Sequence, residues 1–85
     1  MKIIFSDKAK KQFLKLDKPV QQQIKKFISR LETMNDPRSS GKMLVGNLIG
    51  FWRYRVGDYR LLCKIIDNEL IIVVVEIGHR KEIYN

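Results

Sequence analysis

The sequence predicts a single α+β domain, in which a helical hairpin packs on one face of an antiparallel sheet in the order β-α-α-β-β-β. Apolar side chains recur at helical spacing from Ala9 to Met34, whereas residues 51–77 are rich in aromatic and β-branched side chains. The chain has 85 residues, of which 45% are hydrophobic and 31% are charged, and this suits one globular core. We therefore expect residues 1–85 to form one domain, which is too small for a Rossmann-type cofactor fold.

The first half is predicted to hold a short strand and two helices. Residues 3–5 form the strand, and Ser6-Asp7 suit the N-terminal cap of the first helix. Pro19, which a helix tolerates only in its first turn, separates the two helices. The apolar positions are Ala9, Phe13, Leu14 and Leu16 in the first helix, and Val20, Ile24, Phe27, Ile28, Leu31 and Met34 in the second. The hairpin therefore has one apolar face that needs a partner.

Three strands in the second half are expected to supply that partner. Asn35-Asp36-Pro37 closes the second helix, and residues 38–50 are expected to form a loop with a short extended piece. The predicted strands are residues 51–56, 59–66 and 70–77. Gly57-Asp58 fits a two-residue turn of type II′, which takes glycine at its first position, and residues 67–69 form a second short turn.

The Gly57-Asp58 turn fixes the register of the strands beside it. It pairs Arg55 with Arg60 and Arg53 with Leu62, so the three arginines project from one face of the sheet. Like charges directly opposite each other destabilise a sheet. Arginine also suits bidentate contact with phosphate or carboxylate. We therefore expect an anion site here rather than a solvated outer face.

An apolar strip is predicted beside these arginines. If Asp67 pairs with Leu70, then Val75 lies opposite Leu62 and Ile77 lies opposite Arg60. The strip consists of Leu62, Ile66, Ile71, Val73, Val75 and Ile77. The face that packs on the helices carries Trp52, Tyr54, Val56, Tyr59, Leu61, Cys63 and Ile65. Exposed apolar strips usually mark a surface that binds a partner.

The C-terminal segment leaves the last strand near Arg60. It carries an imidazole at His79, a guanidinium at Arg80 and a phenol at Tyr84. We expect these groups to join the arginines, where they offer donors for a phosphate and a ring for a base.

The net charge of +8 points to polyanionic partners such as nucleic acid or acidic protein. Residues 1–42 hold eleven Lys and Arg against four Asp and Glu, whereas residues 43–85 hold six against five. The helical cations that are predicted to face away from the core are Lys10, Lys11, Lys15, Lys18, Lys25, Lys26 and Arg30. Each of them alone is also consistent with an ordinary solvated helix surface.

Several classes of protein are excluded by the same composition. The lone Cys63 excludes an internal disulfide framework and a cysteine-based zinc site. Residues 1–5 lead into charged sequence without the apolar core of a signal peptide. The longest apolar run, residues 70–75, is far short of the roughly 18 residues that a membrane span needs. We therefore expect a cytoplasmic protein without metal, cofactor or membrane contact.

The sequence resembles the RelE/ParE superfamily of bacterial and archaeal toxins, and more closely its RelE branch. The resemblance is carried by Leu44-Val45-Gly46, by residues 52–61 and by residues 78–84, and it covers essentially the whole chain. It implies the β-α-α-β-β-β fold, a type II module with a cognate antitoxin, and contact with operator DNA only through the antitoxin complex. It further implies entry into the ribosomal A site and cleavage of the mRNA there. The family's ribonuclease positions fall on Arg53, Arg55, Arg60, Arg80 and Tyr84.

The chemistry of RNA cleavage assigns roles to these residues. Attack by the 2′-OH needs a base, donors for the crowded phosphorane and an acid for the leaving oxygen. Arg60 and Arg80 suit charge stabilisation, and Tyr84 suits stacking on a base. Arginine stands at positions 53 and 55, where the best-known members have lysine, and it is a poor base because its pKa is above about 12. His79 and Lys81 remain the two candidates for the base, and the intrinsic pKa of histidine is the closer of the two to neutral pH.

The resemblance leaves three functions to compare. The first is a ribosome-dependent, metal-independent mRNA endonuclease. In this function, Lys81 and the helical cations bind RNA and the ribosome. Its acidic, amphipathic antitoxin would wrap over Leu62, Val73, Val75 and Ile77. The second is a ParE-like inhibitor of DNA gyrase on the same fold, and the third is a non-catalytic nucleic-acid-binding module.

Overall fold

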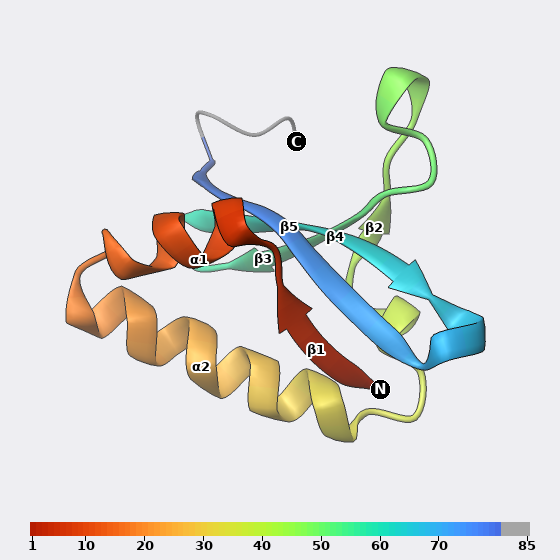
Figure 1. Ribbon diagram of the computed structural model, residues 1–85, viewed down its shortest axis with the longest axis horizontal. Coiled ribbons are helices and arrows are strands. Elements are labelled where there is room, and N and C mark those ends of the chain that lie inside the picture. The colour runs from red at the N-terminus through yellow and green to blue at the C-terminus, as the bar shows by residue number, and fades with distance from the viewer. Residues whose placement is uncertain (81–85) are drawn as a thin grey trace.

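A computed structural model describes residues 1–80, which form two helices and one five-stranded sheet (Figure 1). The elements are β1 (Lys2–Phe5), α1 (Asp7–Leu14), α2 (Lys18–Thr33), β2 (Lys42–Met43), β3 (Trp52–Val56), β4 (Tyr59–Ile66) and β5 (Ile71–His79). Short 3₁₀ helices span Pro37–Ser40, Gly46–Leu48 and Asp67–Glu69. The predicted α+β class and the β-α-α-β-β-β order are confirmed, and β2 is the short extended piece expected in the loop.

The sheet is mixed, with the strand order β1-β5-β4-β3-β2. β1 runs parallel to β5, with Ile3 opposite Ile72, whereas every other pair is antiparallel. The prediction of a wholly antiparallel sheet is therefore wrong at β1. Its direction is set by the route of the chain through two helices, which a local sequence pattern does not reveal.

The helical hairpin begins and turns where the sequence predicts. The Ser6 hydroxyl accepts a hydrogen bond from the Ala9 N–H at 3.0 Å and caps α1. Pro19 lies in the first turn of α2. The Gln21 side chain donates to the carbonyls of Phe13 and Leu16 and so ties α2 to the end of α1. These bonds fix where α1 begins and hold the two helices together.

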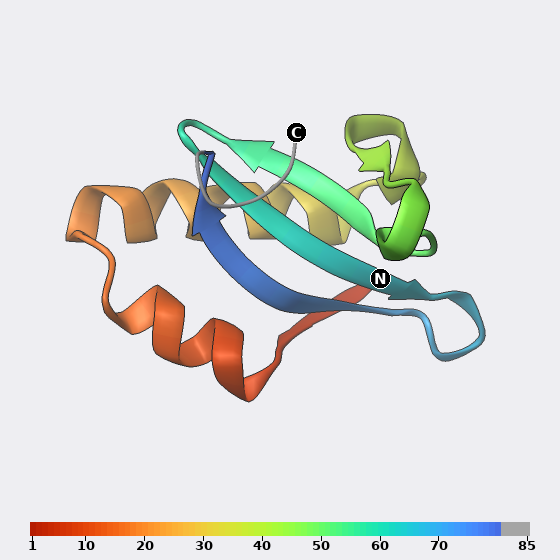
Figure 2. The same cartoon turned by 90° about the horizontal axis from the view of Figure 1, so that it is seen from above.

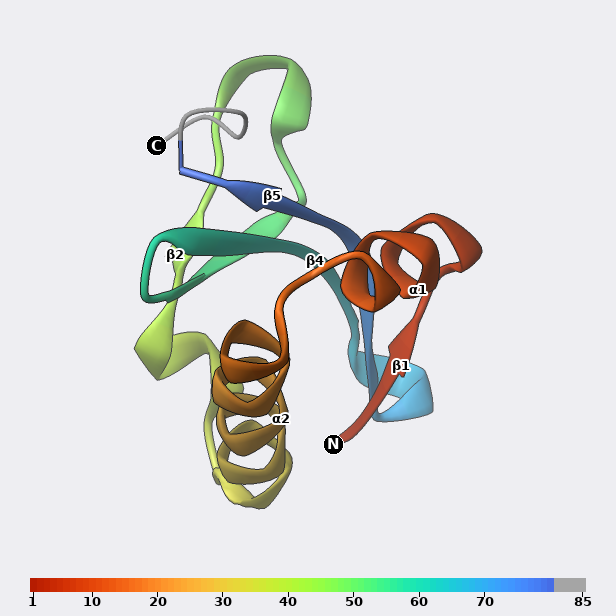
Figure 3. The same cartoon turned by 90° about the vertical axis from the view of Figure 1, so that its left-hand side faces the viewer.

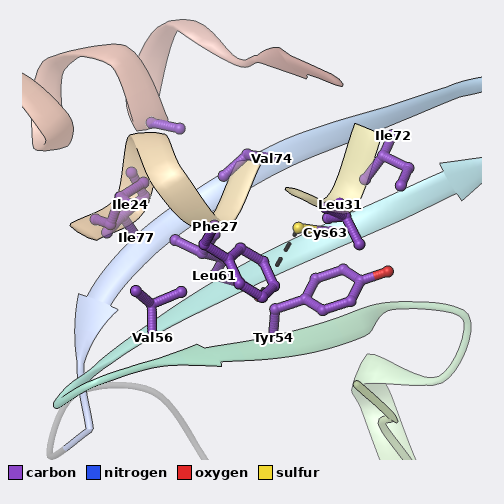
Figure 4. Close-up of a cluster of buried hydrophobic side chains, with 11 residues drawn as sticks. Ile24, Phe27, Leu31, Tyr54, Val56, Leu61, Cys63, Ile72, Val74 and Ile77 are labelled. Atoms are coloured by element: carbon purple, nitrogen blue, oxygen red, sulfur yellow. Dashed lines mark hydrogen bonds between the residues drawn. The ribbon is translucent and has the colours of Figure 1, made fainter. Parts of the chain in front are cut away.

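The core lies between the hairpin and the sheet (Figure 4). Its fully buried larger side chains are Ile24, Leu31, Tyr54, Leu61, Cys63, Ile72 and Val74. The Tyr54 hydroxyl donates to the Pro37 carbonyl at 2.7 Å, which satisfies the polar group and holds the loop after α2 against β3. Figure 1 shows α2 running below the strands, and Figure 3 shows α1 beside β1 and β5.

The register of β5 departs from the prediction halfway along the strand. The expected pairing holds from Ile66 opposite Ile71 to Cys63 opposite Val74, and a β-bulge then leaves Val75 as an extra residue. Leu62 therefore lies opposite Glu76, so the pairings predicted for Val75 and Ile77 are both wrong.

The bulge moves Ile77 from the predicted strip into the core. Ile77 lies opposite Leu61 and is only 3% exposed. The cap of α1 and a side chain near its end stabilise the bulged backbone, because the Ser6 hydroxyl donates to the Val75 carbonyl and the Gln12 side-chain oxygen accepts from the Ile77 N–H. These contacts join residues more than 60 positions apart in the sequence.

No helix in the described part of the chain is long and apolar enough to cross a membrane.

Candidate functional site

The β3–β4 hairpin places the arginines as the turn predicts. Arg55 lies opposite Arg60 and Arg53 lies opposite Leu62. Gly57 has a φ of +58°, a conformation that glycine adopts without strain. Because Tyr54 and Val56 are buried against the helices, the three arginines share the opposite face of the sheet, which is called the arginine face below.

Arg60 is the buried charge of this face. Only 6% of the residue is exposed, and its Nη1 donates to the carbonyls of Gly57 at 3.2 Å and Tyr59 at 3.1 Å. Burial lowers the pKa of Arg60, and the positive charges of Arg55, Arg53 and Arg80 lower it further. An arginine stays protonated under such conditions, so the fold holds a fixed cation at the turn.

Arg80 joins this end of the sheet from β5. Its N–H donates to the Asp58 carbonyl at 2.7 Å, and its Nε lies 3.9 Å from the Asp58 carboxylate. Figure 2 shows the end of β5 next to the β3–β4 turn. Arg53, Arg55, Arg60 and Arg80 are called the arginine cluster below.

His79 lies on the other side of the sheet. It pairs with Tyr59, and the two rings meet edge to face with centroids 5.5 Å apart. Tyr59 packs against the core, so the register separates the imidazole from the Arg60 side of the strands. The expectation that His79 stands among the arginines is therefore not met by the described geometry. Its role as the base stays a prediction.

Two predicted site residues, Lys81 and Tyr84, lie outside the described residues. Their roles in RNA binding and base stacking stay predictions.

The helical cations are all exposed, and two of them approach the arginine cluster. Arg55 borders a hollow of about 290 Å³ that is also lined by Lys26 and Arg30 of α2. The Arg30 guanidinium lies 5.4 Å from the centre of the Phe27 ring, which supports it over the helix. The remaining predicted cations, Lys10, Lys11, Lys15, Lys18 and Lys25, lie elsewhere on the exposed helical surface.

A second hollow also borders Arg55 and was not predicted. It measures about 280 Å³ and is lined by Ser39, Ser40, Gly41, Lys42, Arg53 and Arg55. The one signal for it is a lysine next to a glycine in the loop, because a two-residue strand is too short to show a periodic pattern.

The apolar strip is present without Ile77 and extends further than predicted. Leu62, Val73 and Val75 lie on β4 and β5, with Leu62 buried and the two valines half-buried. Ile4 of β1 lies opposite Val73 and is 38% exposed. It adds a position to the strip that the sequence did not predict, because the parallel pairing of β1 was not foreseen.

A family model for the ParE toxin of the type II toxin–antitoxin system parDE matches residues 3–84. The chain belongs to the RelE/ParE superfamily of toxins. The mRNA interferase toxin RelE of Escherichia coli (strain K12) is 30% identical over 84 residues, which cover 95% of this chain and 86% of that protein.

Solved structures agree with this membership. The toxin–antitoxin complex RelBE2 from Mycobacterium tuberculosis contains a chain that is similar with a TM-score of 0.83 and 29% identity, over 93% of this chain and 90% of that one. An archaeal RelE–RelB complex from Pyrococcus horikoshii OT3 matches with a TM-score of 0.74 over 96% and 97% of the two chains, and at 21% identity it supports the fold alone. The protein is thus a RelE-like type II toxin, as the sequence indicates.

Proposed function

We propose that this toxin is a ribosome-dependent endoribonuclease that cuts mRNA in the A site and so inhibits translation. The observation that carries the proposal is the buried cation Arg60, surrounded on one face of the sheet by Arg53, Arg55 and Arg80. Such a group of fixed guanidinium donors suits the charge that develops on a phosphorane. The name mRNA interferase, given to the relative from E. coli, supports the same activity.

We assign the roles in cleavage as follows. Arg60 and Arg80 at the turn stabilise the pentavalent phosphorus, and Arg53 and Arg55 hold phosphates of the RNA backbone from β3. Lys81 is the better candidate for the base that accepts the 2′-OH proton, because His79 lies on the other side of the sheet. Tyr84 stacks on a base of the substrate. The reaction uses side chains alone and needs no metal ion.

The shape of the site supports a dependence on the ribosome. The hollows beside Arg55 are small, at about 280 and 290 Å³, and a flexible RNA would not be held in line for attack by them. The ribosome supplies that alignment when it holds mRNA in the A site. The exposed helical cations, such as Lys18 and Lys25, bind ribosomal RNA phosphates.

The cognate antitoxin neutralises the toxin by covering the arginine face. An acidic, amphipathic segment would lay apolar side chains over Ile4, Leu62, Val73 and Val75 and carboxylates near the arginines. The complexes of relatives with antitoxins support such a partner. Antitoxin and mRNA then compete for one surface.

Expression of the wild type and of Arg80→Ala tests the proposal. Arg80 is exposed, so we expect the variant to fold. We expect codon-phased mRNA ends on translated transcripts with the wild type, and at least a tenfold reduction with the variant. Lys64→Ala, which removes an equal charge from an exposed position of β4, is the matched control.

Two other outcomes would favour the alternatives. Growth arrest with intact mRNA and damaged DNA would indicate a gyrase inhibitor, an activity suggested by the ParE description of the family model. No toxicity with either protein would indicate a non-catalytic nucleic-acid-binding module.

A further inference from the structure

The hollow at the edge of the sheet is built from cations and small polar residues. Its lining consists of Ser39, Ser40, Gly41, Lys42, Arg53 and Arg55, with no acidic and no apolar side chain. Three positive charges therefore border a space of about 280 Å³, which is large enough for a phosphate group. No ion pair among the described residues involves Lys42 or Arg55.

Two like-charge pairs lie side by side across the strands. Lys42 of β2 pairs with Arg53 of β3, and Arg55 of β3 pairs with Arg60 of β4. On their own, like charges directly opposite each other destabilise a sheet. A bound anion would convert the repulsion into attraction, so the arrangement favours a ligand at both positions.

The close approach of Gly41 to β3 fixes the wall of the hollow. A Cβ atom at this position would lie 2.3 Å from Nε1 of Trp52 and 2.8 Å from the Arg53 carbonyl oxygen. Only glycine lets the chain pass so near the indole, and this contact sets Lys42 beside Arg53. The wall is therefore held by packing rather than left to a loose loop.

The hollow is separate from the place where Arg60 and Arg80 act. Arg60 donates to carbonyls at the β3–β4 turn, and Arg80 contacts Asp58 in that turn. Lys42 lies two strands away from β4, at a spacing of about 4.8 Å per strand. Neither Arg60 nor Arg80 lines the hollow. One RNA strand that crosses β4, β3 and β2 would place successive phosphates at the two positions.

We propose that the hollow of Ser39–Lys42, Arg53 and Arg55 binds an mRNA phosphate next to the one that is cleaved. This inference rests on the proposed endoribonuclease function and adds a substrate subsite to it. Lys42 and Arg53 neutralise the phosphate, and Ser40 offers a hydroxyl donor. The site positions the RNA, whereas the cleavage chemistry belongs to Arg60 and Arg80.

RNA fits the hollow better than the antitoxin does. An amphipathic protein segment would need apolar side chains beneath it, and the hollow has none. The apolar strip suited to that partner lies on β1, β4 and β5, on the far side of β3 from Lys42. The phosphates of an RNA backbone are evenly spaced, so they match a row of cations across the strands. A folded protein segment has no such regular row of negative charges.

Single-turnover cleavage on mRNA-programmed ribosomes tests the subsite. Short mRNAs, each with one uncharged methylphosphonate flanking the cut, are compared between the wild type and Lys42→Gln. We expect one flanking replacement to slow the wild type about tenfold, and Lys42→Gln to slow cleavage of unmodified mRNA by a similar factor. The variant should then be insensitive to that replacement, because the contact is already lost.

Matched variants separate a phosphate contact from general charge. Lys64→Gln should keep both the rate and the sensitivity of the wild type, and Lys42→Arg should restore them. If Lys42→Gln cleaves as fast as the wild type, or if the two effects multiply for every replacement, the mRNA subsite is excluded. A multiplied effect would indicate a ribosomal RNA phosphate. A loss confined to antitoxin binding would assign the hollow to protein carboxylates and would equally overturn the proposal.

A binding measurement tests the subsite without relying on cleavage activity. For a short single-stranded RNA, the slope of log affinity against log salt should be smaller by about 0.7 in Lys42→Gln than in the wild type. If the wild type fails to cut on ribosomes but this difference is found, the proposed function fails while the phosphate site stands. An unchanged slope would exclude the site whatever the cleavage result.

Discussion

Arg60 is a buried positive charge, and burial of a charge costs free energy. The positive charges of the neighbouring arginines add to this cost. The carbonyl partners of Arg60 at Gly57 and Tyr59 compensate part of that cost, but three other arginines raise it again. A strand that served stability alone would not keep Arg55 directly opposite Arg60. The like-charge pairing suits a cluster that binds an anion.

Arg55→Gln should therefore stabilise the folded protein. The substitution removes one like charge from an exposed cross-strand position, so the free energy of unfolding should rise by a few tenths of a kcal/mol, up to about 1 kcal/mol. Urea unfolding of the two proteins measures the difference, with Lys64→Gln as the control for charge alone. A variant that is less stable than the wild type would show that Arg55 serves the fold.

Cys63 gives a prediction on pH dependence. Burial raises the pKa of its thiol from 9.0 to about 12, because the thiolate would be desolvated in the core. The native state therefore keeps a proton that the unfolded state loses, and the contribution to stability is complete below pH 9 and declines as the pH rises towards 12. The thiol should stay unreactive towards a thiol reagent at pH 8 until the protein is unfolded with urea. Rapid labelling of the native protein would contradict this.

At the scale of elements, the β2–β3 edge depends on a single glycine. Gly41→Ala should destabilise the protein by about 1–3 kcal/mol, because the new methyl group overlaps both the Trp52 ring and the Arg53 carbonyl. Chemical denaturation monitored by Trp52 fluorescence measures this. Ser40→Ala, at an exposed neighbour, should change stability by less than about 0.5 kcal/mol. Equal stability of the two variants would show that the segment moves freely away from Trp52.

The elements also show where sequence reasoning succeeds and where it ends. The β3–β4 register was predictable, because a two-residue turn with Gly57 leaves one pairing for Arg55 and Arg60. The β5 register was not, because the bulge at Val75 is held by Ser6, far away in the chain. The parallel direction of β1 depends on the route of the helical hairpin in the same nonlocal way.

At the scale of the whole molecule, charge and chemistry occupy different parts of the fold. Residues 1–42 hold most of the net charge of +8, on helices that cover one face of the sheet. The arginine cluster lies on the other face, in a half of the chain that is nearly neutral. Helical lysines therefore give general attraction to RNA, while fixed guanidinium groups act on the phosphate. Lys42 departs from this division, since it belongs to the first half by sequence and to the arginine face by register.

Incubation of purified toxin with programmed ribosomes tests the central claim most directly. The mRNA fragments are mapped for the wild type and for Arg80→Ala. The proposed function predicts a cut within the A-site codon that requires the ribosome and that falls at least tenfold in the folded variant. Intact mRNA on ribosomes that carry bound wild-type toxin, or an undiminished rate with Arg80→Ala, would contradict it.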